Sequence, residues 1–227
     1  MSGERNSSVL FLGKAADEKC SRALSMIQQH FARVTSYLGN WGDPLPPGLA
    51  HWEGDYVISY LSRWIVPANV LESTKLAAIN FHPGPPEYPG FGCVNFALYE
   101  NAKEYGVTCH HMAPRVDSGP IIAVKRFALV AEDNVESVLA RSHACLLELF
   151  QDIISGLIKS GELPESGEQW SRKPFSRKQL DELGVLRVDM PEAEVARRIR
   201  ATNYAQWKPK LVLGPFEFEL IGINGQD

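Results

Sequence analysis

The sequence predicts an α/β fold with a mostly parallel sheet, followed by a small C-terminal α+β appendage that contains a β-hairpin. Short apolar runs alternate with a segment of helical periodicity from the N-terminus onward, as in β-α-β units. One segment of helical periodicity is much longer than any other, and the chain after it turns into a polar linker. A chain of 227 residues, 44% of them hydrophobic, is large enough to bury a sizeable core.

The first part of the sheet is predicted from four short apolar runs. Each run is bounded by polar or glycine-containing segments, as is typical of buried strands. Between the first two runs, apolar residues recur at helical spacing, so a helix connects them. The strands are expected at Val9 to Gly13, Val34 to Leu38, Asp55 to Leu61 and Lys75 to Phe81, and the helix at Ala15 to Phe31.

The second part of the chain is organised around a long amphipathic helix that ends at Gly161. Asp133 is expected to cap its start, with Glu136 completing a capping box. The polar linker predicts a boundary between an N-terminal domain, residues 1–160, and an appendage, residues 161–227. The other expected elements are a helix at Val94 to Ala102, strands at Gly106 to Met112 and Pro120 to Leu129, a helix at Pro191 to Thr202, and a hairpin of Lys210 to Leu213 with Phe216 to Ile221.

Composition and charge exclude several classes of function. A net charge of −4 and a pI near 5.9 argue against a nucleic-acid partner, which usually requires a basic surface. No apolar run is long enough to span a bilayer and no secretory signal is seen, so we expect a cytoplasmic protein with no membrane partner. Gly13 stands alone after the first strand, without the glycine fingerprint of dinucleotide-binding proteins. Small-molecule chemistry is favoured.

A metal site is not expected. The four cysteines, Cys20, Cys93, Cys109 and Cys145, form no Cys-x-x-Cys pair and are read as reduced thiols. Cys109, His110 and His111 are adjacent in a predicted strand, where successive side chains point to opposite faces and do not converge on one ion.

Residues 80–92 form the most informative stretch of the chain. Asn80 and His82 end a predicted strand and, at a spacing of two, point to the same side. The loop that follows is rich in proline and glycine, which prevents regular structure. In open α/β sheets ligands bind outside the carboxyl ends of the strands, so this loop and the one from Ser62 to Pro67 should border one crevice.

The residue types at this strand end suit acyl or formyl transfer. The amide of Asn80 can hold a carbonyl oxygen as it becomes an oxyanion, and the imidazole of His82 can donate to the same oxygen or carry a proton. Asp117, in a later loop, is a candidate to orient the imidazole. The alternative is that an Asn-x-His at a strand end is structural, and Asp117 with the proline-rich loop favours the functional interpretation.

Four motifs, in this order, resemble those of the folate-dependent formyltransferases. They are Arg63-Trp64-Ile65-Val66-Pro67, Asn80-x-His82-Pro83, Gly106-x-Thr108-x-His110 and Asp117-x-Gly119-Pro120-Ile121-Ile122. The resemblance covers about Val9 to Leu157 and implies a Rossmann-like formyltransferase domain. It implies Asn80, His82 and Asp117 as the catalytic residues.

The resemblance also implies the co-substrate and its contacts. N10-formyltetrahydrofolate would donate the formyl group, and no metal is involved. The residues implied to bind folate are Ser62, Arg63, Trp64, Ile65, Val116 and Asp117. The residues expected to contact the acceptor are Gly84, Tyr88, Phe91 and His110.

The acceptor is indicated only by the length of the chain, its acidic balance and its C-terminal tail. The short tail and acidic balance resemble those of the sugar N-formyltransferases, which implies the amine of a nucleotide-linked amino-deoxysugar, a role in lipopolysaccharide O-antigen biosynthesis and a homodimer. The exposed strand from Phe216 is a candidate dimer edge. The alternatives are another amine, that of methionyl-tRNA or of a small metabolite, and a folate-binding protein without turnover. The sequence of the loop from His82 to Gly90 differs from the motif that is more common in the family, so the contacts to the acceptor are expected to differ there.

Several polar residues have two interpretations. Tyr88 and Phe91 can stack on a substrate or cover the loop. Arg197, Arg198 and Arg200 can bind a diphosphate or lie on a solvated helix face, and the second is favoured. His143 is expected to be a hydrogen-bonded packing residue on the long helix.

Overall fold

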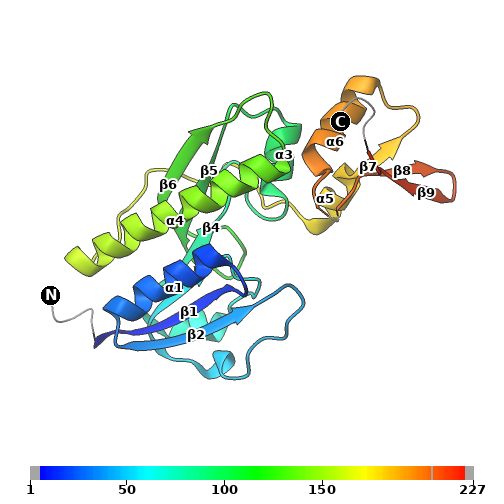
Figure 1. Cartoon of the computed structure of the whole chain (residues 1–227). Helices are drawn as coiled ribbons and strands as arrows, with labels where there is room; N and C mark the ends of the chain where they lie inside the picture. The colour runs from blue at the N-terminus through cyan, green and yellow to red at the C-terminus, as the bar shows by residue number, and fades with distance from the viewer. Residues whose placement is uncertain (1–5, 206, 223–227) are drawn as a thin grey trace.

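Six strands form the central sheet, in the order β2-β1-β3-β4-β5-β6 (Figure 1). The computed structural model describes residues 6–205 and 207–222. Strands β1 to β4 run parallel to one another, whereas β5 pairs antiparallel with β4 and β6 pairs antiparallel with β5. The bounds of the strands are β1 Ser8–Lys14, β2 Arg33–Gly39, β3 Gly54–Tyr60, β4 Thr74–His82, β5 Glu104–His111 and β6 Ile121–Ala128.

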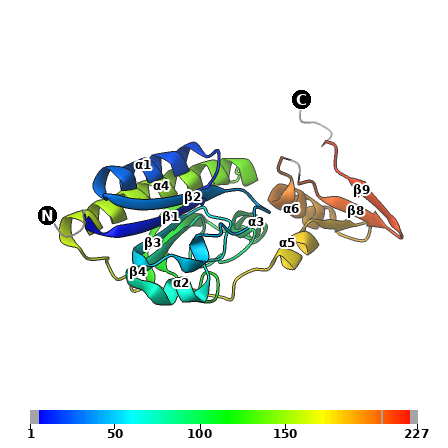
Figure 2. The same cartoon turned by 90° about the horizontal axis from the view of Figure 1, so that it is seen from below.

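Helices cover both faces of this sheet. One face carries α1 and α4, and the opposite face carries α2 (Figure 2). The bounds are α1 Glu18–His30, the 3₁₀ helix η2 Leu49–His51, α2 Ala68–Ser73, α3 Cys93–Tyr99 and α4 Val135–Ser160. The predicted α/β class with a mostly parallel sheet is confirmed, and the predicted strands are all present. Helix α2 was not predicted, because its six residues make fewer than two helical turns, which is too short for apolar spacing to repeat.

The long helix α4 begins one residue later than predicted. Asn134, in an extended conformation, is the N-cap: its side chain accepts from Ser137 N at 3.0 Å, and Ser137 Oγ accepts from Asn134 N at 3.2 Å. The prediction of Asp133 with Glu136 as the capping box is therefore wrong. Asp133 instead accepts from Val130 N at 2.8 Å and pairs with Arg141, which secures the loop before the helix.

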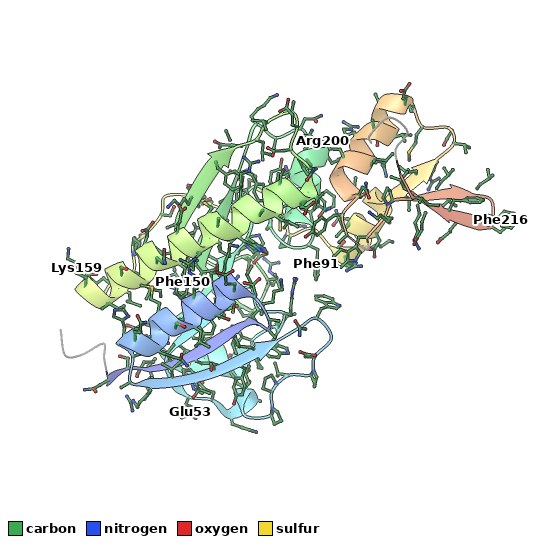
Figure 3. The ribbon with its side chains drawn as sticks, in the orientation of Figure 1. Glu53, Phe91, Phe150, Lys159, Arg200 and Phe216 are labelled. Carbon is green, nitrogen blue, oxygen red and sulfur yellow. The ribbon has the colours of Figure 1, made fainter. Side chains whose placement is uncertain are left out.

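The C-terminal part contains a second, three-stranded sheet in the order β7-β8-β9. The hairpin of β8 and β9 and helix α6 were predicted, whereas α5 and β7 were not, because both are short. Figure 3 shows Phe216 at the far tip of the hairpin, and β9 is an edge strand. The domain boundary at residue 160 stays a prediction. The bounds are α5 Arg177–Leu183, β7 Val185–Arg187, α6 Glu192–Thr202, β8 Lys210–Leu213 and β9 Phe216–Glu219.

The arginines of α6 bind both within the C-terminal part and to the chain before it. Arg200 donates from Nε to Asp133 O at 2.8 Å and from Nη2 to Val130 O at 3.3 Å, where α6 meets α3 and α4 (Figure 3). Arg198 donates to three carbonyl oxygens at the end of α5 and the start of β7. Arg197 pairs with Glu194. These guanidinium groups are engaged in structural contacts and not spread over a solvated face.

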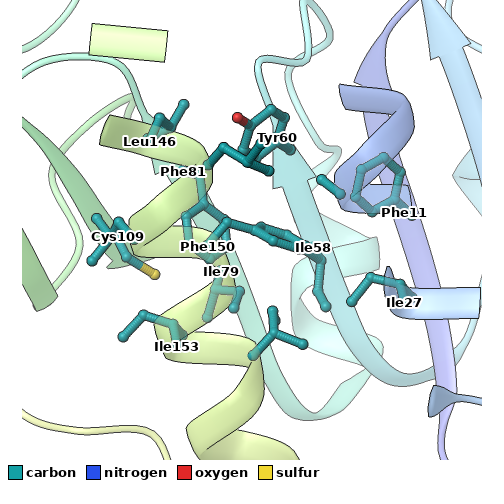
Figure 4. Close-up of a cluster of buried hydrophobic side chains, with 14 of the residues drawn as sticks. Phe11, Ile27, Ile58, Tyr60, Ile79, Phe81, Cys109, Leu146, Phe150 and Ile153 are labelled. Atoms are coloured by element: carbon teal, nitrogen blue, oxygen red, sulfur yellow. The ribbon is translucent and has the colours of Figure 1, made fainter. Parts of the chain in front are cut away.

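Three buried aromatic rings lie at the centre of the main core, between the sheet and α4 (Figure 4). The ring of Phe150 on α4 lies 4.8 Å from that of Phe81 and 5.3 Å from that of Tyr60 between centroids. All three side chains are at most 1% exposed. This cluster holds β3 and β4 against α4, and so fixes the strand that carries Asn80 and His82. Among the described residues, no helix has the length and apolarity needed to cross a membrane.

Replacing Phe150 with Ala is expected to lower the free energy of unfolding by about 3–5 kcal/mol, because it leaves a cavity among well-packed rings. Urea denaturation followed by circular dichroism measures the change. Val130→Ala is the control, since that side chain is 53% exposed and should change stability by less than about 0.5 kcal/mol. Equal stability of the two variants would contradict this account of the core.

Candidate active site

Alternation along β4 and β5 brings polar side chains together on one face of the sheet. Phe81 points into the core under α4, so Asn80 and His82 point to the opposite face. In the antiparallel pairing, Asn80 lies opposite His110 and His82 lies opposite Thr108. A β-bulge at His110 alters the register locally, a feature that is frequent beside active sites. The chain thus places an amide and two imidazoles at the carboxyl end of β4.

The carboxylate of Asp117 lies between the two histidines. Its Oδ2 is 3.3 Å from His82 Nδ1, and its Oδ1 is 3.4 Å from His110 Nε2. Gly90 N donates to Oδ2 at 2.8 Å, which ties the loop after β4 to the loop after β5. Asp117 is 5% exposed and has a φ of 44°, a left-handed conformation that is uncommon for a residue with a side chain. Such strain is often kept at functional sites.

Both ring nitrogens of His82 face acceptors. Nδ1 faces the Asp117 carboxylate, and Nε2 lies 3.4 Å from Tyr88 O. Because each nitrogen needs a proton to donate, the contacts favour the imidazolium form. Burial would lower the pKa of His82, but the carboxylate of Asp117, with smaller effects of Cys93 and Tyr88 O, raises it to about 9. The ring is therefore charged at neutral pH.

The same pair shifts the acid in the opposite direction. Burial would raise the pKa of Asp117, whereas His82, His110 and the Gly90 N–H lower it to about 2. A buried ion pair with hydrogen bonds to its remaining lone pairs is stable as charges, and removing one partner leaves an uncompensated charge. The site therefore holds a fixed positive charge and a fixed negative charge side by side.

His110 has a partner in either protonation state. Its Nδ1 lies 2.8 Å from His111 O, to which it donates. Its Nε2 lies 3.1 Å from Asn80 Nδ2 and 3.4 Å from Asp117 Oδ1. An unprotonated Nε2 accepts from the amide, and a protonated Nε2 donates to the carboxylate. Asn80 is half-buried and is the most exposed of these polar side chains.

Of the residues expected to contact the acceptor, only Phe91 is substantially exposed. Gly84 is buried, and a Cβ there would lie 2.6 Å from His82 Nε2, so glycine leaves the space that the ring occupies. Tyr88 is 6% exposed and donates to Glu100 Oε2 at 3.0 Å, which favours the covering interpretation over stacking on a substrate. Phe91 is 39% exposed and packs edge to face on Trp41, with centroids 5.8 Å apart.

The predicted folate contacts lie on two neighbouring loops. Trp64, in the loop after β3, and Met112, at the start of the loop after β5, pack against one hydrophobic cluster. Ile65 is 71% exposed and Val116 is 47% exposed, so each loop presents an apolar side chain to solvent. Ser62 Oγ accepts from Trp64 N at 3.2 Å, which shapes the first loop. Arg63 is exposed.

Trp170 is the main residue that the sequence analysis missed. Its ring lies 5.1 Å from that of His110 and 6.0 Å from that of His82 between centroids. It belongs to the segment interpreted as a linker, where a tryptophan among polar residues was the available signal. His143, half-buried on α4, has its pKa lowered to about 4 by burial, and its hydrogen bond stays a prediction. Within residues 6–205 and 207–222, no group of three or more His, Cys, Asp or Glu side chains is arranged to hold a metal ion.

The comparisons with known proteins agree with these motifs. The model of the family described as formyl transferase matches residues 48–153. A methionyl-tRNA formyltransferase of Listeria innocua is 27% identical over 152 residues, which are 66% of this chain and 48% of the relative. The chain therefore spans about half the length of the curated relatives that it matches. The predicted resemblance to the formyltransferases is confirmed.

Solved structures show the same fold over nearly the whole chain. A sugar N-formyltransferase from Shewanella superposes with a TM-score of 0.74 at 18% identity, covering 94% of this chain and 96% of the other. An N-formyltransferase from Helicobacter canadensis, in complex with folinic acid and dTDP-3-aminofucose, gives a TM-score of 0.69 at 19% identity, covering 86% of this chain and 80% of the other. At these identities the likeness shows the fold.

Replacing Asp117 with Asn is expected to lower the pKa of His82 from about 9 to below 6.5, because burial then acts without the opposing carboxylate. Titration of the imidazole signals by NMR measures the change. Cys93 and Tyr88, which also face the His82 ring, are unchanged in this variant. His110, on the other side of the carboxylate, is unchanged as well. Asp189→Asn removes an exposed carboxylate and serves as the control. A His82 that still titrates near 9 in the Asp117 variant would contradict the ion pair.

The same pair predicts how stability depends on pH. The pKa of His82 is raised from 6.5, so its contribution is complete below pH 6.5 and is lost as the pH rises through about 9. The pKa of Asp117 is lowered from 3.8, so its contribution is present above pH 3.8 and is lost as the pH falls through about 2. Denaturation midpoints measured across this range should fall at both ends in the wild type. The alkaline fall should be smaller in the Asp117→Asn variant.

Proposed function

We propose that this protein is an N-formyltransferase that moves a formyl group from N10-formyltetrahydrofolate to the primary amine of a nucleotide-linked amino-deoxysugar. The observation that carries the proposal is the set of contacts linking Asn80, His110, Asp117 and His82 at the carboxyl end of β4. This arrangement offers hydrogen-bond donors, a fixed positive charge and a proton carrier within one site.

The two neighbouring loops fit a folate. Ile65 and Val116 offer exposed apolar surface for a flat ring system, and the backbone from Ser62 to Ile65 offers polar groups along its edge. When bound, N10-formyltetrahydrofolate supplies the formyl carbon, which leaves N10 and forms a bond to the acceptor nitrogen. The exposed Arg63 is suited to an anionic part of either substrate.

The roles of the polar residues follow from charge development. Attack by an amine on a formyl carbon makes the formyl oxygen negative, and the amide of Asn80 is positioned to donate to it. His82, as an imidazolium, adds positive charge to the site, and Asp117 keeps its ring oriented. The attacking amine loses a proton and the departing N10 of the folate takes one up, and His110 suits this transfer because its Nε2 lies between an amide and a carboxylate.

The choice of acceptor rests on comparison. Structures that match most of this chain include sugar N-formyltransferases, and one of them holds a nucleotide-linked amino sugar. A second candidate acceptor is methionyl-tRNA, because the curated relatives carry that name. The net charge of −4 disfavours it. A homodimer through the edge strand β9, a cytoplasmic location and a role in O-antigen biosynthesis stay predictions.

Replacing Asn80 with Ala is expected to reduce turnover roughly a hundredfold, since one oxyanion donor contributes about 3 kcal/mol. Release of tetrahydrofolate measures the rate, and fluorescence titration measures folate affinity, which should change little. Asn95→Ala is a matched control, because that amide donates to Ala201 O, away from the site. An Asn80→Ala enzyme with full turnover would refute the assignment.

A panel of amines distinguishes the candidate functions. The wild type is mixed with formyltetrahydrofolate and with nucleotide-linked amino sugars, methionyl-tRNA or glycinamide ribonucleotide, and the formylated products are identified by mass spectrometry. Transfer to an amino sugar supports the proposal, whereas transfer to the tRNA alone would replace it with the second candidate. Folate binding without transfer to any of them would favour a non-catalytic folate-binding protein.

A further inference from the structure

A strap of the chain, residues 162–176, crosses the face of the sheet opposite α4. Ser166 N donates to Ile121 O at 3.2 Å at the start of β6. Further along, Ser171 N donates to Pro86 O at 3.2 Å and Phe175 N donates to Pro89 O at 2.9 Å. The strap therefore joins the loop after β4 to the beginning of β6, and it passes over the side of the sheet that carries the two histidines.

Trp170 is the residue by which the strap reaches the site. Its ring is perpendicular to both imidazoles, at interplanar angles of 85° to His110 and 73° to His82. Its indole Nε1 donates to Gly119 O at 2.8 Å. Edge-to-face ring contacts and a buried donor with a partner both hold a side chain in one orientation. One residue thus contacts two rings and the backbone of the loop that carries Asp117.

The backbone that Trp170 binds is under tight constraint. A Cβ on Gly119 would lie 1.9 Å from His111 O, so this loop runs directly against the end of β5. Two residues earlier, Asp117 has its left-handed φ of 44°. A conformation of this kind persists only where the surrounding structure holds it. The indole hydrogen bond is one of the contacts that hold the loop.

Ordinary core packing does not account for Trp170. The residue is half-buried, and among the described residues it belongs to none of the three hydrophobic clusters. Its ring contacts are to the imidazoles of His82 and His110. His82 and Asp117 beside it are each 5% exposed, and the electrostatic interaction of such a pair is stronger where water is excluded.

We propose that Trp170 is a positioning residue for the formyl transfer proposed above: it fixes the rings of His82 and His110 and holds the loop of Asp117 through Gly119. It acts through these residues and not on the substrates. Its loss lets the rings rotate and admits water, which misplaces the donors for the developing oxyanion. Turnover should therefore fall while folate affinity is largely kept.

The test compares Trp170→Phe, which keeps a ring but loses the indole donor, with Trp170→Ala, which loses both. Gln169→Ala is the matched control, because this exposed neighbour lies on the same strap. The first measurement is solvent exchange of the ring N–H protons of His82 by NMR, without any substrate. We expect exchange at least about tenfold faster in Trp170→Ala, an intermediate rate in Trp170→Phe, and the wild-type rate in the control.

The second measurement is steady-state kinetics with the acceptor found in the amine panel. Trp170→Ala should lower kcat roughly a hundredfold and Trp170→Phe about tenfold, with little change in KM for the folate, since misplacing catalytic groups by about 1 Å has effects of this size. If Trp170→Ala does not fold, Trp170→Phe carries the test. Wild-type exchange and wild-type kcat in the folded variants would overturn the proposal.

The two measurements separate this inference from the function on which it rests. Ring-proton exchange is measured in the free protein and does not depend on any reaction. One outcome is that exchange is slow in the wild type and fast in the Trp170 variants, while the protein formylates no amine. This outcome would support the positioning role of Trp170 and refute the proposed formyl transfer. Exchange that is the same in all variants would refute the positioning role even if the protein is active.

Discussion

The buried carboxylate of Asp117 is the group on which the site depends. It contacts two histidines and a backbone N–H, and these come from three different segments of the chain. An isolated carboxylate at this depth would be protonated, because burial disfavours charge. It is ionised because His82 is itself charged, and His82 is charged because the carboxylate is ionised. Neither group has its functional state without the other.

The two faces of the sheet have different roles, one in the core and one in the site. Odd-numbered residues of β4 such as Phe81 enter the core under α4, whereas Asn80 and His82 enter the site on the opposite face. The aromatic core therefore fixes the position and direction of β4. The side chains of the site are held in place because they project from this rigid strand. A site built on a strand end is held more closely than one built on loops alone. Here the loop after β4 is tied to Asp117 through Gly90 N and to β5 through the hydrogen bond that Thr108 Oγ1 donates to Gly84 O.

The strap and the C-terminal part have separate tasks. The strap covers one side of the site through Trp170, and Arg200 of α6 binds the C-terminal part to two carbonyl oxygens in the loop before α4. Carbonyl oxygens at the ends of helices and loops lack partners of their own, so guanidinium donors from α6 satisfy them. Arg198 and Arg200, for which the sequence favoured a solvated helix face over a diphosphate site, are used in this way. Exposed apolar residues remain at the hairpin, where Phe216 is 63% and Phe218 is 52% exposed.

The sequence by itself determined the fold class, the strands of the main sheet and the identity of Asn80, His82 and Asp117 as neighbours. Periodicity encodes which side of a strand a residue occupies, and this local feature places Asn80 beside His82. Asp117 was identified from its position in a loop and from the resemblance of the motifs. Short elements such as α2 and β7 were missed, because they contain too few residues to show a period. The capping of α4 was misplaced by one residue, since two candidate cap residues are adjacent and only the backbone conformation selects Asn134.

Only the tertiary structure decided how the site is arranged. His110 meets Asn80 because β5 pairs with β4 in one particular register, which no local pattern specifies. Tyr88 and Gly84 were expected at a ligand surface, but folding buries them, because burial depends on what packs above a loop. Trp170 lies almost ninety residues from His82 in the chain, and its place against the imidazoles follows from the path of the strap. Contacts between distant segments are set by the packing of the whole fold, and the charges of His82 and Asp117 follow from those contacts.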